Sequence, residues 1–466
     1  MRRLSFAGLL LALFGAQPVY AEVHEYILDN GLRLFVQQDR RAPVVVSQVW
    51  YGVGGSYEHD GITGISHALE HMMFKGTEKY GPGQFSRIIS ANGGEDNAFT
   101  GSDYTAYYQK LEASRLEVSF ELEADRMRNL TLPEAEFIKE MEVIKEERRM
   151  RTEDNPQSFT YETAMSVAYQ TSPYRQPIVG WMDDLDNMTL ADMRDWYERW
   201  YAPNNALVVV VGDVDPDAVH ALAKKHFGPL PAKAEKPKPV VRPEVEQRGI
   251  KRVVVKRPAE LPYLYMAYKV PVLKTALAET AAIPEWEPYA LEVLAGILDG
   301  GKSARFTRNL IRDQEVAAGV SAGYNLSARL PVSTFTLSGT PANDHSVAEL
   351  ERAIRDELNK LQETPVETEE LERVKTQVVA SNVYERDSVF YQAMLIGLLE
   401  TVGLSWQMID DYVTKVQAVT AEQVQAVAKK YFKDDYLTVA ELEPLPTDSP
   451  GRPGAPAPTT GADHVH

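Results

Sequence analysis

Apolar residues cluster along the first part of the chain in short runs typical of β-strands. Two runs rich in Ile, Leu, Phe and Val flank Asp29-Asn30-Gly31 and predict a hairpin. A third strand is predicted in APVVVSQVWYGVGGS and a fourth in NAFTGSDYTAYYQKL, which is rich in aromatic and β-branched residues. Helical patterns cover residues 64–75, 83–91, 111–128, 133–151 and 190–200. This mixture of strands and helices predicts an α+β fold.

A proline-rich stretch divides the chain into two parts. Residues 229–249 combine prolines with alternating charge, a composition that predicts a semi-rigid spacer rather than a packed core. After it, strands are predicted in IKRVVVKR, YLYMAYKVP and VSTFTLSGTP, with helices over residues 289–298 and 304–311. We therefore expect an N-terminal lobe over residues 22–228 and a C-terminal lobe over residues 250–445. Each is expected to be a mostly antiparallel sheet packed with helices.

A weak internal repeat supports two similar lobes. The segment MTLADMRDWYERWYAPNNALVV aligns without gaps on VTAEQVQAVAKKYFKDDYLTVA, which pairs Thr189 with Thr420 and Val208 with Val439. Both segments stand near the end of a predicted lobe, where a duplication would place them.

The first 21 residues have the composition of a secretory signal peptide. Arg2 and Arg3 precede an apolar segment too short to span a bilayer, and Val19-Tyr20-Ala21 supplies a small-residue cleavage site. No later apolar run is long enough to cross a membrane, so we expect a soluble product exported to the periplasm. Residues 446–466 are rich in Pro, Gly, Ala and Thr and predict a disordered tail.

Charge and cysteine content exclude several classes of function. The chain carries 67 acidic and 49 basic residues, a net charge of −18, which makes a poor surface for nucleic acid. Cysteine is absent, so neither a cysteine nucleophile nor a thiolate metal site is available.

The segment SHALEHMMFKGT carries the strongest chemical signal. On a helix, His67 and His71 lie one turn apart and Glu70 projects from the same face. Two imidazoles in this arrangement suit one zinc ion, and the carboxylate is close enough to hold a water on the metal without binding it. The alternative is a pair of surface or capped core histidines. A catalytic zinc also needs a third protein ligand and one open position.

The acidic helix PEAEFIKEMEVIKEERRMR supplies that ligand by helical phase. Glu142 and Glu146 point away from the apolar face, whereas Glu147 lies on it and is the predicted third ligand. Glu140, two turns earlier, is predicted to support the ligands or to act as an auxiliary catalytic acid. The alternative for Glu140 is an ion pair with a buried arginine. The residues predicted to share the apolar face are Phe137, Glu140, Val143, Ile144, Glu147 and Arg151.

With these residues the chain resembles the pitrilysin/insulinase metallopeptidases, the inverzincins, named for the reversed HxxEH motif. The resemblance extends through NGGEDNAFTGSDYTAYY and more weakly through the second lobe. It implies a half-size member with two similar lobes and one Zn²⁺ per chain, which needs a second chain to close a chamber. It also implies that the substrate adds as a strand beside Asn97, Ala98 and Phe99, continuing to Thr100.

One departure from the family pattern concerns the second lobe. Active members carry an Arg and a Tyr seven residues apart that hold the substrate and the reaction intermediate. Arg312 matches the arginine, but Gly319 stands at the tyrosine position, and Tyr324 is no obvious substitute. The resemblance therefore implies either a heterodimer whose related subunit supplies the Arg/Tyr pair or a homodimer with a different donor.

The hypothesis drawn from these observations is a zinc-dependent endopeptidase acting on short unfolded peptides inside a dimeric chamber. A zinc-activated water would attack the peptide, with Glu70 as the general base. The alternative is a non-catalytic peptide-binding or assembly subunit of the same fold. A purely structural zinc site is disfavoured because Glu70 would have no role in it.

Overall fold

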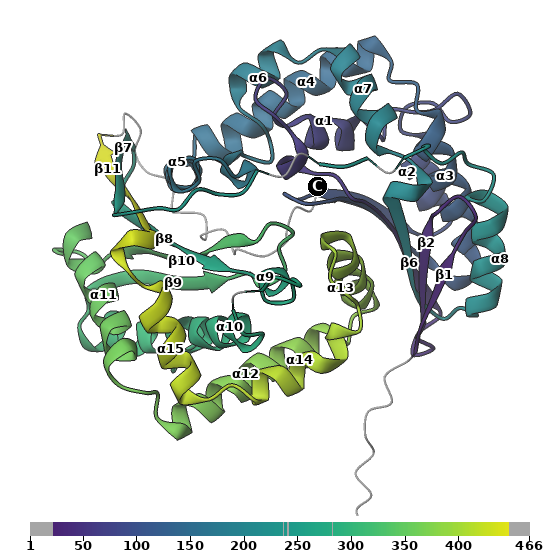
Figure 1. The fold of residues 1–466 in the computed structure, drawn as a ribbon. Helices are drawn as coiled ribbons and strands as arrows, with labels where there is room; N and C mark the ends of the chain where they lie inside the picture. The colour runs from purple at the N-terminus through teal and green to yellow at the C-terminus, as the bar shows by residue number, and fades with distance from the viewer. Residues whose placement is uncertain (1–21, 236, 240–241, 282, 447–466) are drawn as a thin grey trace, which may run out of the picture.

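Two β-sheets organise the molecule (Figure 1). The computed structural model describes residues 22–235, 237–239, 242–281 and 283–446. The predicted signal peptide and the tail from residue 447 onward lie outside these residues. Within the described part of the chain, no helix is long and apolar enough to cross a membrane.

The first sheet has six strands in the order β1-β2-β6-β3-β5-β4. The predicted hairpin is confirmed by the antiparallel pairing of β1 with β2, and only β2 and β6 pair in parallel. Strand β4 forms one edge. The strands are β1 (Val23–Ile27), β2 (Arg33–Gln38), β3 (Val44–Tyr51), β4 (Glu95–Thr100), β5 (Thr105–Glu112) and β6 (Ala206–Gly212).

The second sheet repeats this plan with five strands in the order β7-β11-β8-β10-β9. Strand β11 pairs in parallel with β7 and antiparallel with β8, as β6 does with β2 and β3. Strand β9 occupies the edge that β4 occupies in the first sheet. The strands are β7 (Lys251–Pro258), β8 (Tyr263–Pro271), β9 (Ala317–Tyr324), β10 (Val332–Pro341) and β11 (Leu437–Leu445).

The predicted repeat corresponds to equivalent elements of the two sheets. Thr189 caps α7 (Leu190–Trp200) through a capping box with Asp192, and Thr420 caps α15 (Ala421–Tyr431) in the same way. Each helix leads into a central strand, β6 or β11. Two similar α+β halves are therefore confirmed.

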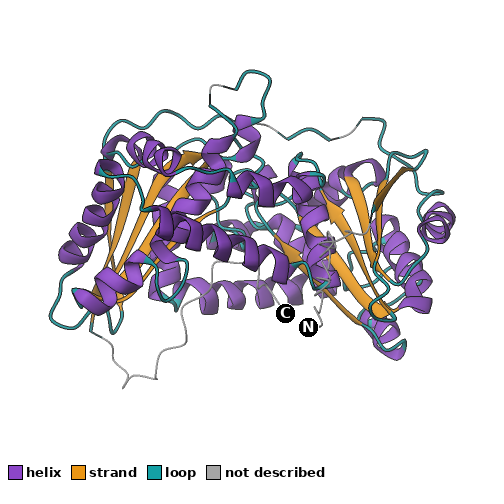
Figure 2. Cartoon of the chain, turned by 90° about the horizontal axis from the view of Figure 1, so that it is seen from below, coloured by secondary structure: helices purple, strands orange, loops and turns teal. Residues whose placement is uncertain are grey.

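Helices cover both sheets (Figure 2). Those of the N-terminal part are α1 (Ile65–Met72), α2 (Gln84–Ala91), α3 (Leu116–Asn129), α4 (Glu134–Arg148), α5 (Pro156–Ala168), α6 (Met182–Asn187), α7 and α8 (Pro216–His226). Those of the C-terminal part are α9 (Leu273–Ala276), α10 (Trp286–Asp299), α11 (Val347–Glu363), α12 (Thr368–Glu385), α13 (Val389–Val402), α14 (Met408–Gln417) and α15. Short 3-10 or π segments include η1 (Gly55–Tyr57), η3 (Arg149–Glu153), η4 (Pro173–Arg175) and η6 (Phe306–Asp313).

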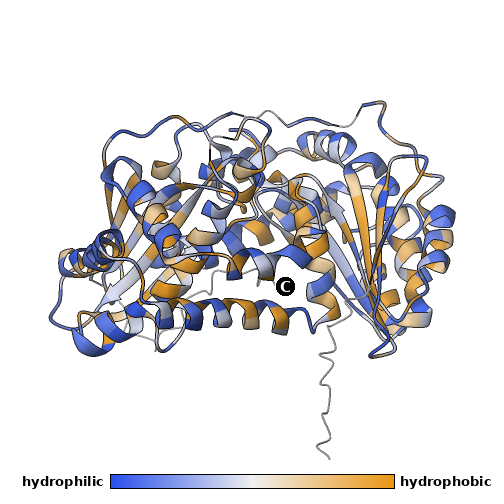
Figure 3. Ribbon diagram, turned by 60° about the horizontal axis from the view of Figure 1, so that its bottom comes forward, coloured by the Kyte–Doolittle hydropathy of each residue, from blue (hydrophilic) through white to orange (hydrophobic). Residues whose placement is uncertain are grey.

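The two halves exchange a helix. Helix α13 packs on β3 and β6 of the first sheet, and α5 packs on β7, β8 and β11 of the second (Figure 1). Trp50 is fully buried under α13, and a Cβ at Gly397 would come within 2.2 Å of its indole, so only glycine fits there. Hydrophobic residues are concentrated on the strands that these helices cover (Figure 3). Each sheet therefore completes its second face with a helix from the other half.

The predicted single strand from Asn97 is wrong in one respect. It is a hairpin of β4 and β5, closed by a hydrogen bond from the Gly101 N–H to the Tyr104 carbonyl at 2.8 Å. Because β5 continues to Glu112, the following helix starts at Leu116 rather than at residue 111. The segment GSD is a turn composition within an otherwise strand-like run.

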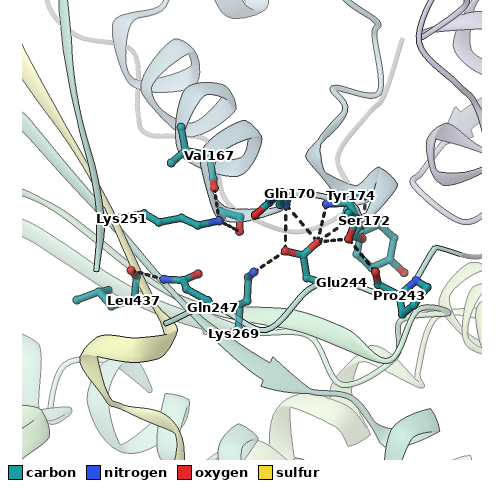
Figure 4. A network of polar contacts seen from close by, with 12 residues as sticks. Val167, Gln170, Ser172, Tyr174, Pro243, Glu244, Gln247, Lys251, Lys269 and Leu437 are labelled. Carbon is teal, nitrogen blue, oxygen red and sulfur yellow. Dashed lines mark hydrogen bonds and ion pairs between the residues drawn. The ribbon is translucent and has the colours of Figure 1, made fainter. Parts of the chain in front are cut away.

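The end of the proline-rich stretch is anchored to both halves of the molecule. Described residues between α8 and β7 form neither helix nor strand, and Glu244 near the end of this stretch makes the contacts drawn in Figure 4. Glu244 accepts hydrogen bonds from the backbone N–H groups of Gln170 and Ser172 and pairs with Lys269. Although burial opposes ionisation, these donors lower the pKa of Glu244 to about 2. This charged carboxylate ties the end of α5 to β8.

Candidate metal centre

Helix α1, which carries the two histidines, is fixed at its first turn by a buried acid. Glu58 accepts the backbone N–H groups of Gly64 at 2.7 Å and Ser66 at 2.8 Å, which have no partner inside the helix. Burial raises the pKa of Glu58 to about 7 despite these bonds. Gly64 has a φ of 85°, and a Cβ there would meet the Val179 carbonyl oxygen at 2.4 Å. Glu58 was not predicted, since nothing in the neighbouring sequence marks it as a cap.

The two histidines of the motif face α4, and Glu70 contacts β4. His67 and Glu70 are buried, and the side chain of His71 is 11 % exposed. Leu69 and Met72 are fully buried on the other sides of the helix. The polar face predicted from helical phase is therefore present.

Glu147 of α4 meets both imidazoles. Its Oε1 lies 3.6 Å from His67 Nε2, and its Oε2 lies 3.4 Å from His71 Nε2. Ligand atoms of these three residues all lie within 4.8 Å of one another, and among the described residues no other group of three or more His, Asp or Glu converges in this way. A tetrahedral zinc with bonds of about 2.0–2.2 Å places its ligands roughly 3.3–3.6 Å apart. The donor set and its spacing fit a zinc ion.

A second carboxylate supports this group. Glu140 lies 3.3 Å from His71 Nδ1 and pairs with Lys75 Nζ at 2.6 Å. A zinc-ligating histidine typically donates its other ring nitrogen to a carboxylate in this way. The predicted supporting position of Glu140 thus agrees with the geometry, and its cationic partner is Lys75 rather than an arginine. Lys75 was not predicted.

The acids and histidines shift one another's ionisation. Although burial opposes the charge, hydrogen bonds with Glu140 and Glu147 raise the pKa of His71 to about 9. Burial likewise opposes ionisation of Glu147, but the hydrogen bond with His71 and the charges of His67 and Arg151 lower its pKa to about 2. The carboxylates of Glu70, Glu140 and Glu147 lie around the imidazoles of His67 and His71, and this negative charge favours binding of a cation.

Helical phase on α4 was correct for the acids and wrong for one apolar residue. The side chains of Glu142 and Glu146 are 68 % and 61 % exposed, and Arg151 pairs with Glu147 as the shared face predicts. Val143, predicted on the buried face, is 50 % exposed. The apolar face predicted for α4 is therefore wider than the part of this helix that packs against α1.

Strand β4 lies at the edge of the first sheet, as the substrate-strand prediction requires. Ala98 is fully buried on the α1 side, and its N–H is held by the Asn97 side chain at 2.8 Å. Phe99 packs on Trp50, on the opposite face of the sheet. The side chains of Ala98 and Phe99 therefore point to opposite faces of the sheet, so a strand bound along this edge would contact β4 mainly through backbone groups. Thr100, which was predicted only as the end of the substrate-binding strand, donates a hydrogen bond to Glu70.

The predicted residues of the second half lie on other elements. Arg312 is exposed on η6, which packs against β9, α10 and α11. Gly319 is on β9, and nothing lies within 4 Å of a Cβ built there. The Tyr324 hydroxyl donates to the Pro271 carbonyl at 2.7 Å, which holds this side chain against the second sheet.

Comparisons with known proteins agree with this geometry. The family model described as Insulinase (Peptidase family M16) matches residues 33–180, which include His67, Glu70, His71 and Glu147, and the Peptidase M16 inactive domain matches residues 187–378. The chain is 33 % identical over 453 residues to the zinc protease PqqE of Helicobacter pylori, covering 95 % of this chain and 98 % of that protein.

Two solved structures share the fold. The crystal structure of a protease from Helicobacter pylori matches with a TM-score of 0.85 and 31 % identity, covering 91 % of this chain and 100 % of that one. The periplasmic protease PqqL from Escherichia coli matches with a TM-score of 0.73 and 20 % identity, covering 90 % of this chain but 47 % of that one. The reversed motif, the two similar sheets and a full-length relative together show that the chain belongs to peptidase family M16, the insulinase family, and is a zinc protease.

Proposed function

We propose that this zinc protease is an endopeptidase for short unfolded peptides, with one Zn²⁺ per chain held by His67, His71 and Glu147. The convergence of these three side chains from α1 and α4 carries the proposal. Zinc bound there would supply a Lewis acid that polarises the scissile carbonyl and acidifies a water. Three protein ligands leave a coordination position for substrate or solvent.

Glu70 is the proposed general base. It lies on the same face of α1 as both histidines and is shielded from bulk solvent. Its carboxylate can take the proton of the attacking water and pass it to the leaving amine. Glu140 holds His71 in the orientation that leaves Nε2 directed at Glu147.

The free edge of β4 is the proposed peptide site. Backbone hydrogen bonds along an edge strand bind an extended peptide with little sequence preference. Most strands of a folded protein are already paired within it or protected at their edges, so unfolded peptides are the expected class of substrate.

We propose that the active form is a dimer. This chain matches just under half the length of PqqL, so two copies, or one copy and a related subunit, would supply the equivalent number of lobes. Gly319 leaves each chain without a tyrosine at the position where the family resemblance expects one. Export to the periplasm is proposed from the leader-like residues 1–21, and a periplasmic relative is consistent with it.

Substitution of Gly319 by tyrosine is expected to increase the cleavage rate of the homodimer. The new side chain would enter open space on β9, since nothing within 4 Å obstructs its Cβ. A hydroxyl that stabilises the developing oxyanion contributes about 10²–10³-fold in other enzymes, so a gain of about 10-fold in kcat is a modest expectation. Gly319→Phe, which lacks the hydroxyl, is the matched control. Equal activities for both variants would show that no donor is missing at this position.

Peptide cleavage by the purified chain tests the proposed function. Cleavage of an unstructured peptide is expected to stop with a zinc chelator and to return when Zn²⁺ is added. A tightly folded protein is expected to resist. Peptide binding without cleavage, in zinc-loaded protein and with any co-purifying partner, would instead favour the assembly-subunit alternative.

A further inference from the structure

Thr100 connects the edge strand to the proposed base. It is the last residue of β4 and is 3 % exposed, and its Oγ1 donates a hydrogen bond to Glu70 Oε2. Thr105 Oγ1 lies 3.5 Å from Thr100 Oγ1 and itself donates to the Val53 carbonyl at 3.0 Å. The Thr100 hydroxyl is thus directed at the carboxylate.

The backbone of the same residue faces the open side of the sheet. Gly101 and Tyr104 are joined across the turn, so the antiparallel pattern directs the N–H and C=O groups of alternate residues Ala98 and Thr100 away from β5. The Ala98 N–H agrees, because it bonds to a side chain instead of to β5. Side chains of these two residues point to the α1 face. Thr100 therefore offers its backbone to the edge and its hydroxyl to Glu70.

The turn after Thr100 is held independently of this hydroxyl. Asp103 accepts hydrogen bonds from Ser56 Oγ at 2.6 Å and from Arg329 Nε at 3.2 Å, and Tyr174 donates to its other oxygen. Arg329 belongs to the β9–β10 connection of the second sheet, so both halves of the molecule fix this turn. Loss of the Thr100 hydroxyl alone should leave the strand in place.

We infer that Thr100 is a positioning residue that sets Glu70 in register with a peptide strand bound along β4. This inference rests on the proposed function, because it assigns Thr100 a role only through the base. A peptide bonded to the backbone of Ala98 and Thr100 is located along the strand, and the hydroxyl locates Glu70 relative to the same residue. Misplacement of a catalytic group by about 1 Å can cost about 100-fold in rate.

The test compares Thr100→Val, Thr100→Ala and Thr100→Ser in the full chain. Loss of the hydroxyl in the first two is expected to lower kcat about 10- to 100-fold with KM changed less than about twofold, since the edge strand remains and the base loses its hydrogen bond to that strand. The serine variant keeps the hydroxyl and should recover most of kcat. Zinc content and thermal unfolding are measured for each protein.

Thr160→Val is the matched control. Thr160 is also fully buried and donates to the Pro156 carbonyl at 2.7 Å, but it lies on α5. It should lose some stability and keep kcat. Unchanged kcat in both hydroxyl-free variants of Thr100, a rise in KM alone, or a loss of activity matched by loss of zinc would overturn the inference. In any of these cases, a Glu70→Gln protein that is inactive would still support the proposed function. A Glu70→Gln protein that remains active would refute both the proposed function and the role of Thr100.

Discussion

Glu70→Gln is expected to bind zinc normally and to lose nearly all peptide cleavage. Glutamine has nearly the same shape as glutamate, and its amide oxygen can still accept a hydrogen bond from the Thr100 hydroxyl. The fold and the positions of the histidines should therefore be undisturbed. The amide cannot take a proton from water. General base catalysis contributes about 10²–10⁴-fold, and we expect a loss of kcat at the upper end of that range.

Zinc content by elemental analysis and cleavage of an unstructured peptide check this result together. A purified Glu70→Gln protein that still cleaves at the wild-type rate would refute the assignment of the base. The comparison protein is Glu146→Gln, which makes the same chemical change at a side chain that is 61 % exposed.

Glu147→Gln is expected to lose zinc. The neutral amide is a weaker ligand, and the change also removes the carboxylate that pairs with His67, His71 and Arg151. Activity should fall to the level of chelated wild-type protein, with most of the metal released on dialysis. Glu146→Gln, one residue earlier on the exposed side of α4, should retain both.

Full metal occupancy in Glu147→Gln would contradict this ligand assignment. It would direct attention to Glu142 or Glu146, although both side chains are directed to solvent. Partial occupancy with normal activity per bound zinc would mean that Glu147 strengthens binding without being required for it.

Local periodicity explains why the convergence of His67, His71 and Glu147 was predictable from the sequence. The side chains of His67, Glu70 and His71 are placed by the repeat of one helix, and Glu147 by the repeat of another. Neither prediction needed knowledge of how the chain folds at long range. The only remaining requirement was that α1 and α4 pack together, which the buried acids on α4 already suggested.

Features that depend on long-range pairing were not predictable in this way. Thr100 reaches Glu70 only because β4 runs along the sheet edge under α1, and the break between β4 and β5 was missed within a continuous strand-like run. Strand β9 was missed as well, since its glycines and alanines give little β-propensity. The exposure of Val143 shows what helical periodicity alone cannot predict. It gives the direction in which a side chain projects from α4, but not how much of that face the neighbouring helix covers.

The exchange of α5 and α13 also constrains the order in which the chain can fold. The Gln48 side chain contacts the Phe390 carbonyl across 342 residues of sequence. A chain made from its N-terminus cannot cover the outer face of the first sheet until residues 389–402 exist, so that face stays exposed during most of synthesis. Such distant contacts slow folding and leave an intermediate prone to aggregation. The risk of aggregation is therefore highest before the chain is complete.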